Sequence, residues 1–241
     1  MTKDIPRSVT VEICSACNRR CVWCPQSKFH RSMVYLPLPI IEKVATDLAE
    51  IGYTSGFGLH HFNEPLLDNR LPQIIRLVKA ILPQSEVYIH TNGDCLTLDK
   101  WHELRSAGLG QAQVNQYDGC VSQPIADLHA ALSEEEKQRF KLRVFGRRNI
   151  GNRAGLIHTR RTLPIKGRCK RIWQACINYE GSLVLCCNDY NGVVNVGNVA
   201  DDSIVNIFNH PRLVHYRKTL ETGNREGLEL CDRCDMRTRG K

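Results

Sequence analysis

The chain has 241 residues, of which 42% are hydrophobic, and a formal net charge of +8 at pH 7, so it can bury a substantial core as one domain or two. No apolar run approaches the roughly 20 residues that a membrane-spanning helix needs, and residues 1–6 lack the apolar stretch of a secretory signal. These properties exclude a helical membrane protein and speak against a secreted one. We therefore expect a cytoplasmic protein with no membrane partner.

The cysteines are numerous and unevenly placed. In the reducing cytosol, twelve of them indicate metal binding rather than disulfides. They gather near the two ends of the sequence, with two isolated ones between: positions 14, 17, 21 and 24, then 95 and 120, then 169, 176, 186, 187, 231 and 234. This distribution predicts two separate metal sites.

The positive charge is concentrated in one segment. Residues 137–179 contain thirteen Lys or Arg and no Asp or Glu, whereas the rest of the chain carries 20 basic and 25 acidic side chains. Such a segment is either a solvated basic face or a patch near the active site that attracts an anionic substrate or an acidic electron carrier.

Strands and helices alternate in the pattern of apolar residues. Strands are expected at 9–13, 56–62, 86–90, 111–116 and 141–145. Helices are expected between them at 39–51, 69–82, 98–107 and 125–140. A hairpin at 177–185 and a helical segment at 203–220, interrupted by Pro211, follow after the last of these strands.

This alternation predicts parallel β/α units and an α/β fold. Five or so units are too few for a complete eight-stranded barrel. We therefore expect a partial, TIM-like (β/α) barrel over residues 1–158, with its chemistry at the carboxyl ends of the strands. Residues 159–241 are expected to form a small domain of a β-hairpin plus a helix.

The most informative stretch follows the first predicted strand. Cys17, Cys21 and Cys24 have the spacing C-x3-C-x2-C. Three thiolates on one short loop can hold three irons of a cubane [4Fe–4S] cluster and leave the fourth iron without a protein ligand. The alternatives are a zinc site completed from elsewhere in the chain, or a few buried free thiols.

Polar motifs come after the later predicted strands. They are Asn63-Glu64-Pro65, Thr91-Asn92-Gly93, the run that begins at Gln116, and the run around Arg153. Each alone could be an ordinary turn. Their common position after successive strands predicts that they line one site.

With these motifs the chain resembles the radical S-adenosylmethionine (SAM) enzymes, whose signature is this cysteine spacing with an aromatic residue before the last cysteine. The resemblance implies that the open iron binds SAM and that Trp23 lies against the adenine. Glu64, next to Asn63, would hold the SAM ammonium group. Asn63 stands where the family's G-G-E-P loop has its second glycine, a position of close backbone approach. Further cofactor contacts are implied for a polar set near the ribose and methionine: Thr91, Asn92 and Gln116.

A second set of cysteines lies in the C-terminal part. Cys169 and Cys186 are followed by the C-x2-C pair Cys231 and Cys234, and four thiolates can close either a zinc site or a fully ligated [4Fe–4S] cluster. This part is similar to the SPASM and twitch domains of radical SAM enzymes, which implies one auxiliary [4Fe–4S] cluster and two clusters in all. Adjacent residues on a strand face opposite ways. The Gly-x4-Cys spacing selects Cys186 as the ligand, and Cys187 would then point elsewhere, with the substrate cavity as one option.

Within that family the chain looks most like short twitch dehydrogenases of the 2-deoxy-scyllo-inosamine type in natural-product biosynthesis. The resemblance implies that a 5′-deoxyadenosyl radical removes hydrogen from a carbinol carbon, and that a ketone forms as an electron passes to the auxiliary cluster. The substrate would be a small sugar- or cyclitol-like molecule, including phosphorylated or nucleotide-linked ones. A flavodoxin- or ferredoxin-type protein would supply electrons. Arg153 would orient the hydroxyl, and His60, His61 and His90 are candidate bases.

Three other functions are weighed against this one. In an epimerase, the Cys187 thiol would return a hydrogen atom to the substrate radical. A peptide-modifying radical SAM enzyme would also use an auxiliary cluster. A zinc-stabilised nucleic-acid-binding protein is disfavoured, because few aromatic residues interleave the basic segment and the β/α pattern is not that of a small zinc module.

Overall fold

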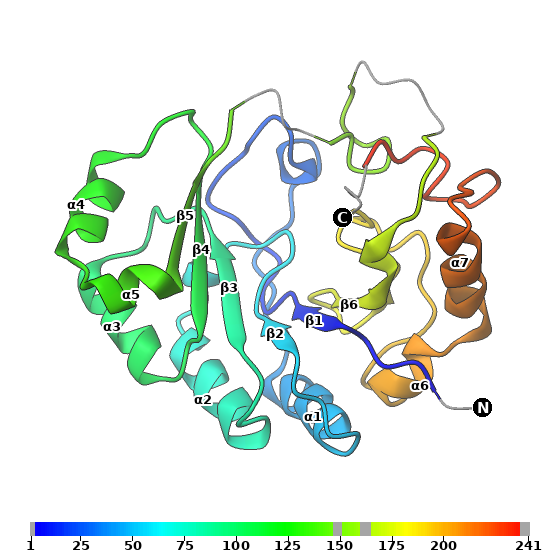
Figure 1. The fold of residues 1–241 in the computed structure, drawn as a ribbon, viewed down its shortest axis with the longest axis horizontal. Coiled ribbons are helices and arrows are strands. Elements are labelled where there is room, and N and C mark those ends of the chain that lie inside the picture. Colours follow the sequence, from blue (N-terminus) through cyan, green and yellow to red (C-terminus); the bar gives the residue numbers. More distant parts are fainter. Residues whose placement is uncertain (1–2, 147–150, 160–164, 237–241) are drawn as a thin grey trace.

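The computed structural model describes residues 3–146, 151–159 and 165–236. One seven-stranded sheet of order β5-β4-β3-β2-β1-β6-β7 organises it (Figure 1). The first five strands are parallel to their neighbours: β1 (Ser8–Val11), β2 (Gly56–Gly58), β3 (Val87–Thr91), β4 (Gln111–Gln116) and β5 (Phe140–Val144). The remaining strands, β6 (Gln174–Ile177) and β7 (Leu183–Val184), extend the sheet from the free edge of β1, with β6 parallel to β1 and β7 antiparallel to β6.

Helices cover the outer face of the first five strands (Figure 1). They are α1 (Leu38–Ala49), α2 (Leu71–Ile81), α3 (Leu98–Ser106), α4 (Gln123–Ala131) and α5 (Glu134–Arg139). On the other side of the molecule, α6 (Ile204–Phe208) and α7 (Pro211–Glu221) lie beyond β6. Short 3₁₀ helices lie within the connecting segments: η1 (Pro25–Ser27), η2 (Pro65–Leu67) and η4 (Lys170–Trp173). This is the expected partial barrel followed by a hairpin and helices.

The core lies between the sheet and this outer layer of helices. On α2, Leu71, Ile74, Ile75 and Val78 repeat at helical spacing and are buried, so this apolar stripe faces the sheet. The strands contribute alternate residues to the same core, which include Val9, Val11, Phe57, Val87, Ile89, Ala112 and Val114. The residues between them therefore face the inside of the barrel, where they are available to line a site.

The structure corrects some element boundaries. The strand expected at 56–62 ends at Gly58, and the polar residues after it form a loop. The helix expected at 125–140 is two helices, because Ser133 begins a new one with a capping box to Glu136. The strand expected at 111–116 is confirmed.

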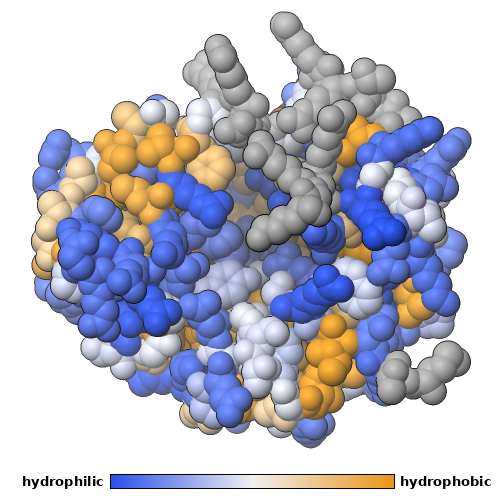
Figure 2. Space-filling view, viewed as in Figure 1, coloured by the Kyte–Doolittle hydropathy of each residue, from blue (hydrophilic) through white to orange (hydrophobic). Residues whose placement is uncertain are grey.

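The described helices and surface agree with the absence of a long apolar run in the sequence. Among the described residues no helix has the length and apolarity to cross a membrane. The face drawn in Figure 2 is largely hydrophilic, and its hydrophobic residues form separate patches.

Gly58 is a packing constraint on the inside of the barrel. A Cβ at this position would lie 2.9 Å from Thr10 Cγ2, from His60 Cε1 and from Tyr88 Cζ. Only a residue without a side chain lets these three groups converge on the barrel floor.

We expect Gly58→Ala to destabilise the protein by about 1–3 kcal/mol, because overpacking forces neighbouring side chains off their rotamers. The measurement is the thermal unfolding midpoint of anaerobically purified protein. Gly146→Ala is the matched control, since a Cβ there has no atom within 4 Å among the described residues. Equal midpoints for the two variants would contradict the packing argument.

Candidate functional site

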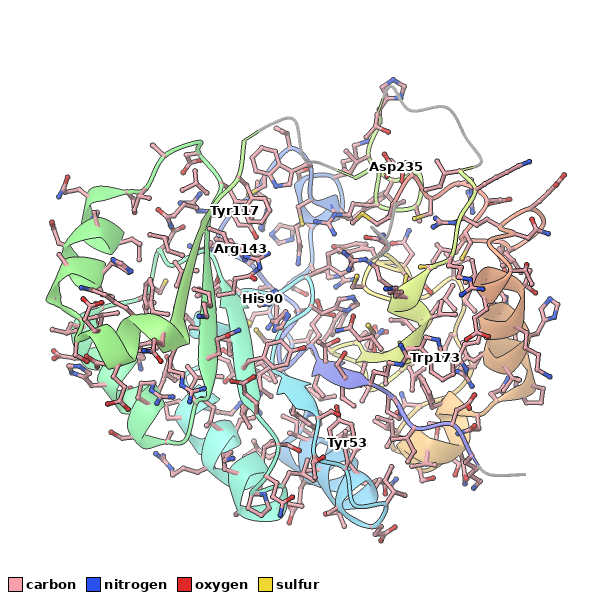
Figure 3. The ribbon with its side chains drawn as sticks, viewed as in Figure 1. Tyr53, His90, Tyr117, Arg143, Trp173 and Asp235 are labelled. Atoms are coloured by element: carbon pink, nitrogen blue, oxygen red, sulfur yellow. The ribbon has the colours of Figure 1, made fainter. Side chains whose placement is uncertain are left out.

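A cavity of about 450 Å³ lies inside the arc of the sheet and reaches the carboxyl ends of β1–β5. Its lining contains most of the residues that the sequence predicts: Cys17, Cys21, Trp23, Cys24, Asn63, Glu64, Thr91, Asn92, Arg153 and Cys187. His90 and Arg143 lie on its inner wall, with Tyr117 near its upper edge (Figure 3). The structure thus brings together motifs that are far apart in the sequence.

The first cysteine loop is fastened to the loops that follow β3 and β4. Arg19 forms ion pairs with Asp94 at 2.6 Å and with Asp118 at 2.9 Å. Asn18 donates to Asp94 and accepts from Asn92 Nδ2. These contacts fix the loop across the carboxyl ends of the strands, so its thiols face the cavity.

The thiols of this loop suit an iron–sulfur cluster. Burial raises the pKa of Cys17 to about 11 and also raises the pKa values of Cys21 and Cys24. The charge of Cys24 adds to the shifts of Cys17 and Cys21. Neutral thiols of this kind become ligands by losing protons as iron binds. Among the described residues, no three His, Cys, Asp or Glu side chains converge as one metal ion would require. A cluster takes each thiolate on a different iron, and this donor set fits a [4Fe–4S] cluster with one open iron.

Glu64 lies beside this loop and is held by three donors. Its Oε1 accepts from Thr91 Oγ1 at 2.6 Å and from Leu66 N at 3.1 Å, and its Oε2 accepts from Asn92 N at 2.8 Å. Burial nevertheless raises its pKa to about 7. Since a carboxylate has about four acceptor sites, Glu64 keeps capacity for a cationic ligand in the cavity.

Asn63 is accommodated without strain. Its Oδ1 accepts from His61 N at 2.8 Å, and its Nδ2 donates to Cys14 Sγ at 3.6 Å. Its backbone is not in the left-handed region, which among the described non-glycine residues only Arg153 and Ala154 adopt. The local turn therefore does not need a glycine at position 63.

Gln116 differs from the other predicted cofactor residues, because it is not part of the cavity lining. Its Nε2 donates to Asn92 O at 2.9 Å, and its Oε1 accepts from Ser122 N at 2.8 Å. Both ends of its amide are thus engaged in holding the Asn92 turn. A direct contact of Gln116 with the cofactor stays a prediction.

The second cysteine set is gathered beside β6. Burial raises the pKa of Cys231 to about 12, and neighbouring Cys169 and Cys234 raise it further. Cys231 in turn raises the pKa of Cys186, so all four predicted ligands interact. Four thiols from three separate segments fit a fully ligated cluster.

Cys187 lines the cavity, whereas none of these four cysteines does. Its Sγ accepts a hydrogen bond from Arg171 Nη1. The arrangement agrees with the predicted division of roles between Cys186 and Cys187, although ligation itself stays a prediction.

The turn that contains Arg153 is held by hydrogen bonds to the residues on either side of Cys234. Asn152 N donates to Asp235 Oδ1 at 2.7 Å, Asn152 Nδ2 donates to Arg233 O at 2.6 Å, and Asp235 N donates back to Asn152 Oδ1 at 3.1 Å. These bonds hold Arg153 and Ala154 in the left-handed region, with φ of 49° and 53°. The segment that contains Cys234 thereby fixes the turn from which Arg153 reaches the cavity.

The inner wall contains residues that the sequence did not single out. Arg143, Arg171, Gln113 and Asn115 all line the cavity, and Arg143 is on β5 next to Asn115 of β4. A period-two count on β4 and β5 gives the face of each residue, but not whether that face encloses a ligand. No signal in the sequence therefore marked them.

Three histidines on the cavity wall are kept neutral. The rings of His60 and His90 stack at 3.9 Å between centroids. Burial lowers the pKa of His90 to about 4, with a further contribution from Arg143. Burial lowers the pKa of His61 to about 3, with further contributions from Arg31 and Arg153. Burial also lowers the pKa of His60, and neighbouring His90 adds to the shift.

Comparison with known families identifies the class of protein. A model of the radical SAM superfamily matches residues 11–117, and a model of the SPASM iron–sulfur cluster-binding domain matches residues 169–235. The chain therefore contains a radical SAM domain and an SPASM domain. It is a radical SAM enzyme, and these domains bind SAM and iron–sulfur clusters.

Individual relatives agree with this class. The S-adenosyl-L-methionine-dependent 2-deoxy-scyllo-inosamine dehydrogenase of Niallia circulans is 24% identical over 233 residues, which are 94% of this chain and 92% of that protein. The crystal structure of BtrN in complex with AdoMet and 2-DOIA has a TM-score of 0.89 and 23% identity, covering 98% of this chain and 95% of that one. Native anSMEcpe with bound AdoMet is more distant, with a TM-score of 0.63, 12% identity, and coverage of 88% and 83%. These similarities establish the fold.

The raised pKa of Glu64 predicts how SAM binding depends on pH. Below about pH 7 this carboxyl is protonated and cannot attract an ammonium group. SAM affinity should therefore fall by up to roughly tenfold per pH unit on acidification below that value. The measurement is equilibrium dialysis of labelled SAM with cluster-loaded protein, without reductant.

Glu64→Gln is the control for this titration. The variant should bind SAM weakly at every pH, with the pH dependence between 5 and 7 removed. If the variant kept the slope of the parent protein, a different group would be responsible.

Proposed function

We propose that the protein oxidises a secondary alcohol of a small cyclitol- or sugar-like substrate to a ketone by radical SAM chemistry. The first cluster and SAM, when bound, supply a 5′-deoxyadenosyl radical. The substrate carbinol would give up a hydrogen atom, one proton and one electron, and Cys169, Cys186, Cys231 and Cys234 would hold the auxiliary cluster that accepts the electron. The 2-deoxy-scyllo-inosamine dehydrogenase relative supports this reaction.

The observation that carries the proposal is that one cavity adjoins both cysteine sets. Cys17, Cys21 and Cys24 line it, and so does Cys187, which is adjacent in sequence to Cys186. A substrate in this cavity is within reach of the radical source and beside an electron acceptor. An adjacent acceptor is what a net two-electron oxidation requires, because the substrate radical must lose one more electron.

The side chains of the cavity have separable roles. Glu64 binds the SAM ammonium group, and Trp23, whose ring lies 5.9 Å from that of Tyr117, packs on the adenine. Arg153 orients the substrate hydroxyl. The neutral imidazoles of His60, His61 and His90 can accept hydrogen bonds or protons from hydroxyl groups.

The charge of the cavity favours an anionic substrate. Among the described residues that line it, Glu64 is the only one with a carboxylate, and its acceptor sites are largely occupied. Arg143 forms no ion pair within the part of the chain that the structure describes, and its charge contributes to the low pKa of His90. We therefore propose a phosphorylated or otherwise anionic polyol, in contrast to an ammonium-bearing aminocyclitol, which these cations would repel.

The protein also needs an external source of single electrons. We propose a flavodoxin- or ferredoxin-type donor that approaches the first cysteine loop, where Val22 is 70% exposed and Arg20 is also exposed. All twelve cysteines are free thiols, which fits a reducing, cytoplasmic setting. Residues 1–158 and 159–241 are proposed as the SAM-binding and auxiliary-cluster units.

The proposed reaction is tested by anaerobic incubation with SAM, a low-potential reductant and a panel of polyols in free, amino and phosphorylated forms. We expect a product two mass units lighter than its substrate, with deuterium moving from the labelled carbinol carbon into 5′-deoxyadenosine. Formation of 5′-deoxyadenosine without a lighter product from any polyol would contradict the proposal.

Arg143→Gln tests the charge of the substrate in the same assay. This variant should lower kcat/KM for a phosphorylated substrate by roughly tenfold or more, because a charge-assisted hydrogen bond contributes about 1.5–3 kcal/mol. The uncharged parent polyol serves as the control and should be affected much less. Equal losses for both substrates would remove the argument for an anion.

Epimerisation is the second candidate, because Cys187 offers a thiol to the same cavity. In that reaction the thiol would return a hydrogen atom to the substrate radical, and no net oxidation would follow. Arg171 donates to Cys187 Sγ, so a guanidinium group contacts the thiol that would have to give the hydrogen atom.

Cys187→Ala distinguishes the two reactions. A dehydrogenase should retain ketone formation within a few-fold of the parent rate. An epimerase should lose turnover while still producing 5′-deoxyadenosine, since hydrogen abstraction precedes the thiol step. The measurement is the ratio of ketone to 5′-deoxyadenosine for each protein, and Cys95→Ala, at an exposed cysteine outside the cavity lining, is the control.

A further inference from the structure

Asn188 makes polar contacts with both the cavity and the second cysteine set. Its side chain is almost fully buried, at 2% exposure. Its Oδ1 accepts from Arg153 Nη1 at 3.3 Å, its Nδ2 donates to Cys234 Sγ at 3.7 Å, and its backbone N donates to Cys186 Sγ at 3.4 Å. One residue thus connects a cavity arginine with two thiols from separate segments.

The position of Asn188 is fixed by the next residue. The carboxylate of buried Asp189 accepts from the backbone N–H groups of Leu185, Val193 and Val194 at 3.3, 2.7 and 3.0 Å. Asp189 N also donates to Cys186 O at 2.9 Å. Because these bonds define the loop from both sides, the Asn188 amide has little freedom to turn away from its partners.

Hydrogen bonds to ligand sulfurs are among the factors that set the potential of an iron–sulfur cluster. An N–H donor next to a thiolate stabilises the reduced, more negative state and so raises the potential. The Asn188 amide donates to such a sulfur through Nδ2 while its oxygen holds Arg153. Its chain of polar contacts, Arg153–Asn188–Cys234, is therefore a connection between the substrate side of the cavity and the auxiliary site.

We infer that Asn188 is a positioning residue that raises the electron affinity of the auxiliary cluster and fixes Arg153 toward the substrate. This inference rests on the proposed function in one respect, that the auxiliary cluster accepts the electron. As the substrate radical becomes a ketone, it releases one proton and one electron, and the cluster is reduced by that electron. Asn188 favours this transfer without contacting the reacting carbon.

Asn188→Ala is the direct test, because it removes the Nδ2 donor and leaves the backbone N–H in place. The auxiliary cluster should become about three- to tenfold less favourable to reduce, a downward shift of about 28–59 mV for one electron. The measurement is a redox titration followed by electron paramagnetic resonance, on protein whose iron and sulfide contents confirm both clusters. Asn195→Ala, at an exposed asparagine of the same domain, should leave the potential unchanged.

Asn188→Asp keeps the shape of the side chain and replaces the donor with a negative oxygen. It should lower the potential further, and it provides the test if the alanine variant does not retain the auxiliary cluster. An unchanged potential in a fully loaded Asn188 variant would overturn the inference.

The link to Arg153 is tested by a double-mutant cycle. Asn188→Ala and Arg153→Gln should each raise KM for the substrate. In the double variant, the fold increase in KM should be smaller than the product of the two single increases. Independent, multiplicative losses would overturn the positioning role. The reduction potential is measured without substrate, so the two proposals can fail separately. If the protein forms no ketone but Asn188→Ala still lowers the potential of the auxiliary cluster, the proposed function is refuted and the effect of Asn188 on the cluster is supported.

Discussion

The parallel pairing of β6 with β1 is the constraint on which the arrangement of the site depends. Four Cα pairs, from Ser8↔Gln174 to Val11↔Ile177, join the first strand to a segment more than 160 residues later. Buried Glu12 reinforces the joint at the end of β1, where its carboxylate accepts from Phe62 N at 3.0 Å and Tyr179 N at 3.3 Å and pairs with Arg31 at 3.2 Å. Through this pairing the C-terminal cysteines lie beside the barrel cavity, where they can serve its chemistry.

The sequence predicted what depends on spacing and period. The C-x3-C-x2-C loop, the polar motifs after successive strands and the alternating apolar pattern led to the fold and to most of the cavity lining. These features are local: a loop after a parallel strand lies at the carboxyl edge of the sheet wherever that strand is placed. The predicted choice of Cys186 over Cys187 rests on the same kind of evidence, because adjacent side chains on an extended segment face opposite ways.

What the sequence did not predict depends on contacts between distant segments. Asn188 reads as part of a turn after two cysteines, and its partners come from the Arg153 turn and the last C-x2-C pair. Gln116 was assigned by its place after a strand, yet its amide supports the turn that contains Asn92. In both cases the residue type and position fit several roles, and only the neighbours in space select one.

The electrostatics of the cavity follow from its position between two cysteine sets. A cluster bound by three or four thiolates is an anionic group, so nearby guanidinium groups such as Arg153 and Arg171 offset its charge as well as contacting ligands. Burial keeps the three histidines neutral by lowering their pKa values, and it is assisted by Arg31 and Arg153 at His61 and by Arg143 at His90. Arg143 differs from Arg153 and Arg171, because it is on β5, at the opposite edge of the barrel from β6. Its charge is therefore the one most available to a substrate.

The fate of a substrate radical in such a cavity is decided by competition between two transfers. An electron can leave toward the auxiliary site, or a hydrogen atom can arrive from a thiol. In this chain the two options come from neighbouring residues, since Cys187 presents its sulfur to the cavity and Asn188 connects Arg153 with Cys234. The Asn188 contacts favour electron acceptance by the auxiliary site. Because a site for electron acceptance lies next to the thiol, a cavity thiol alone does not make this protein an epimerase.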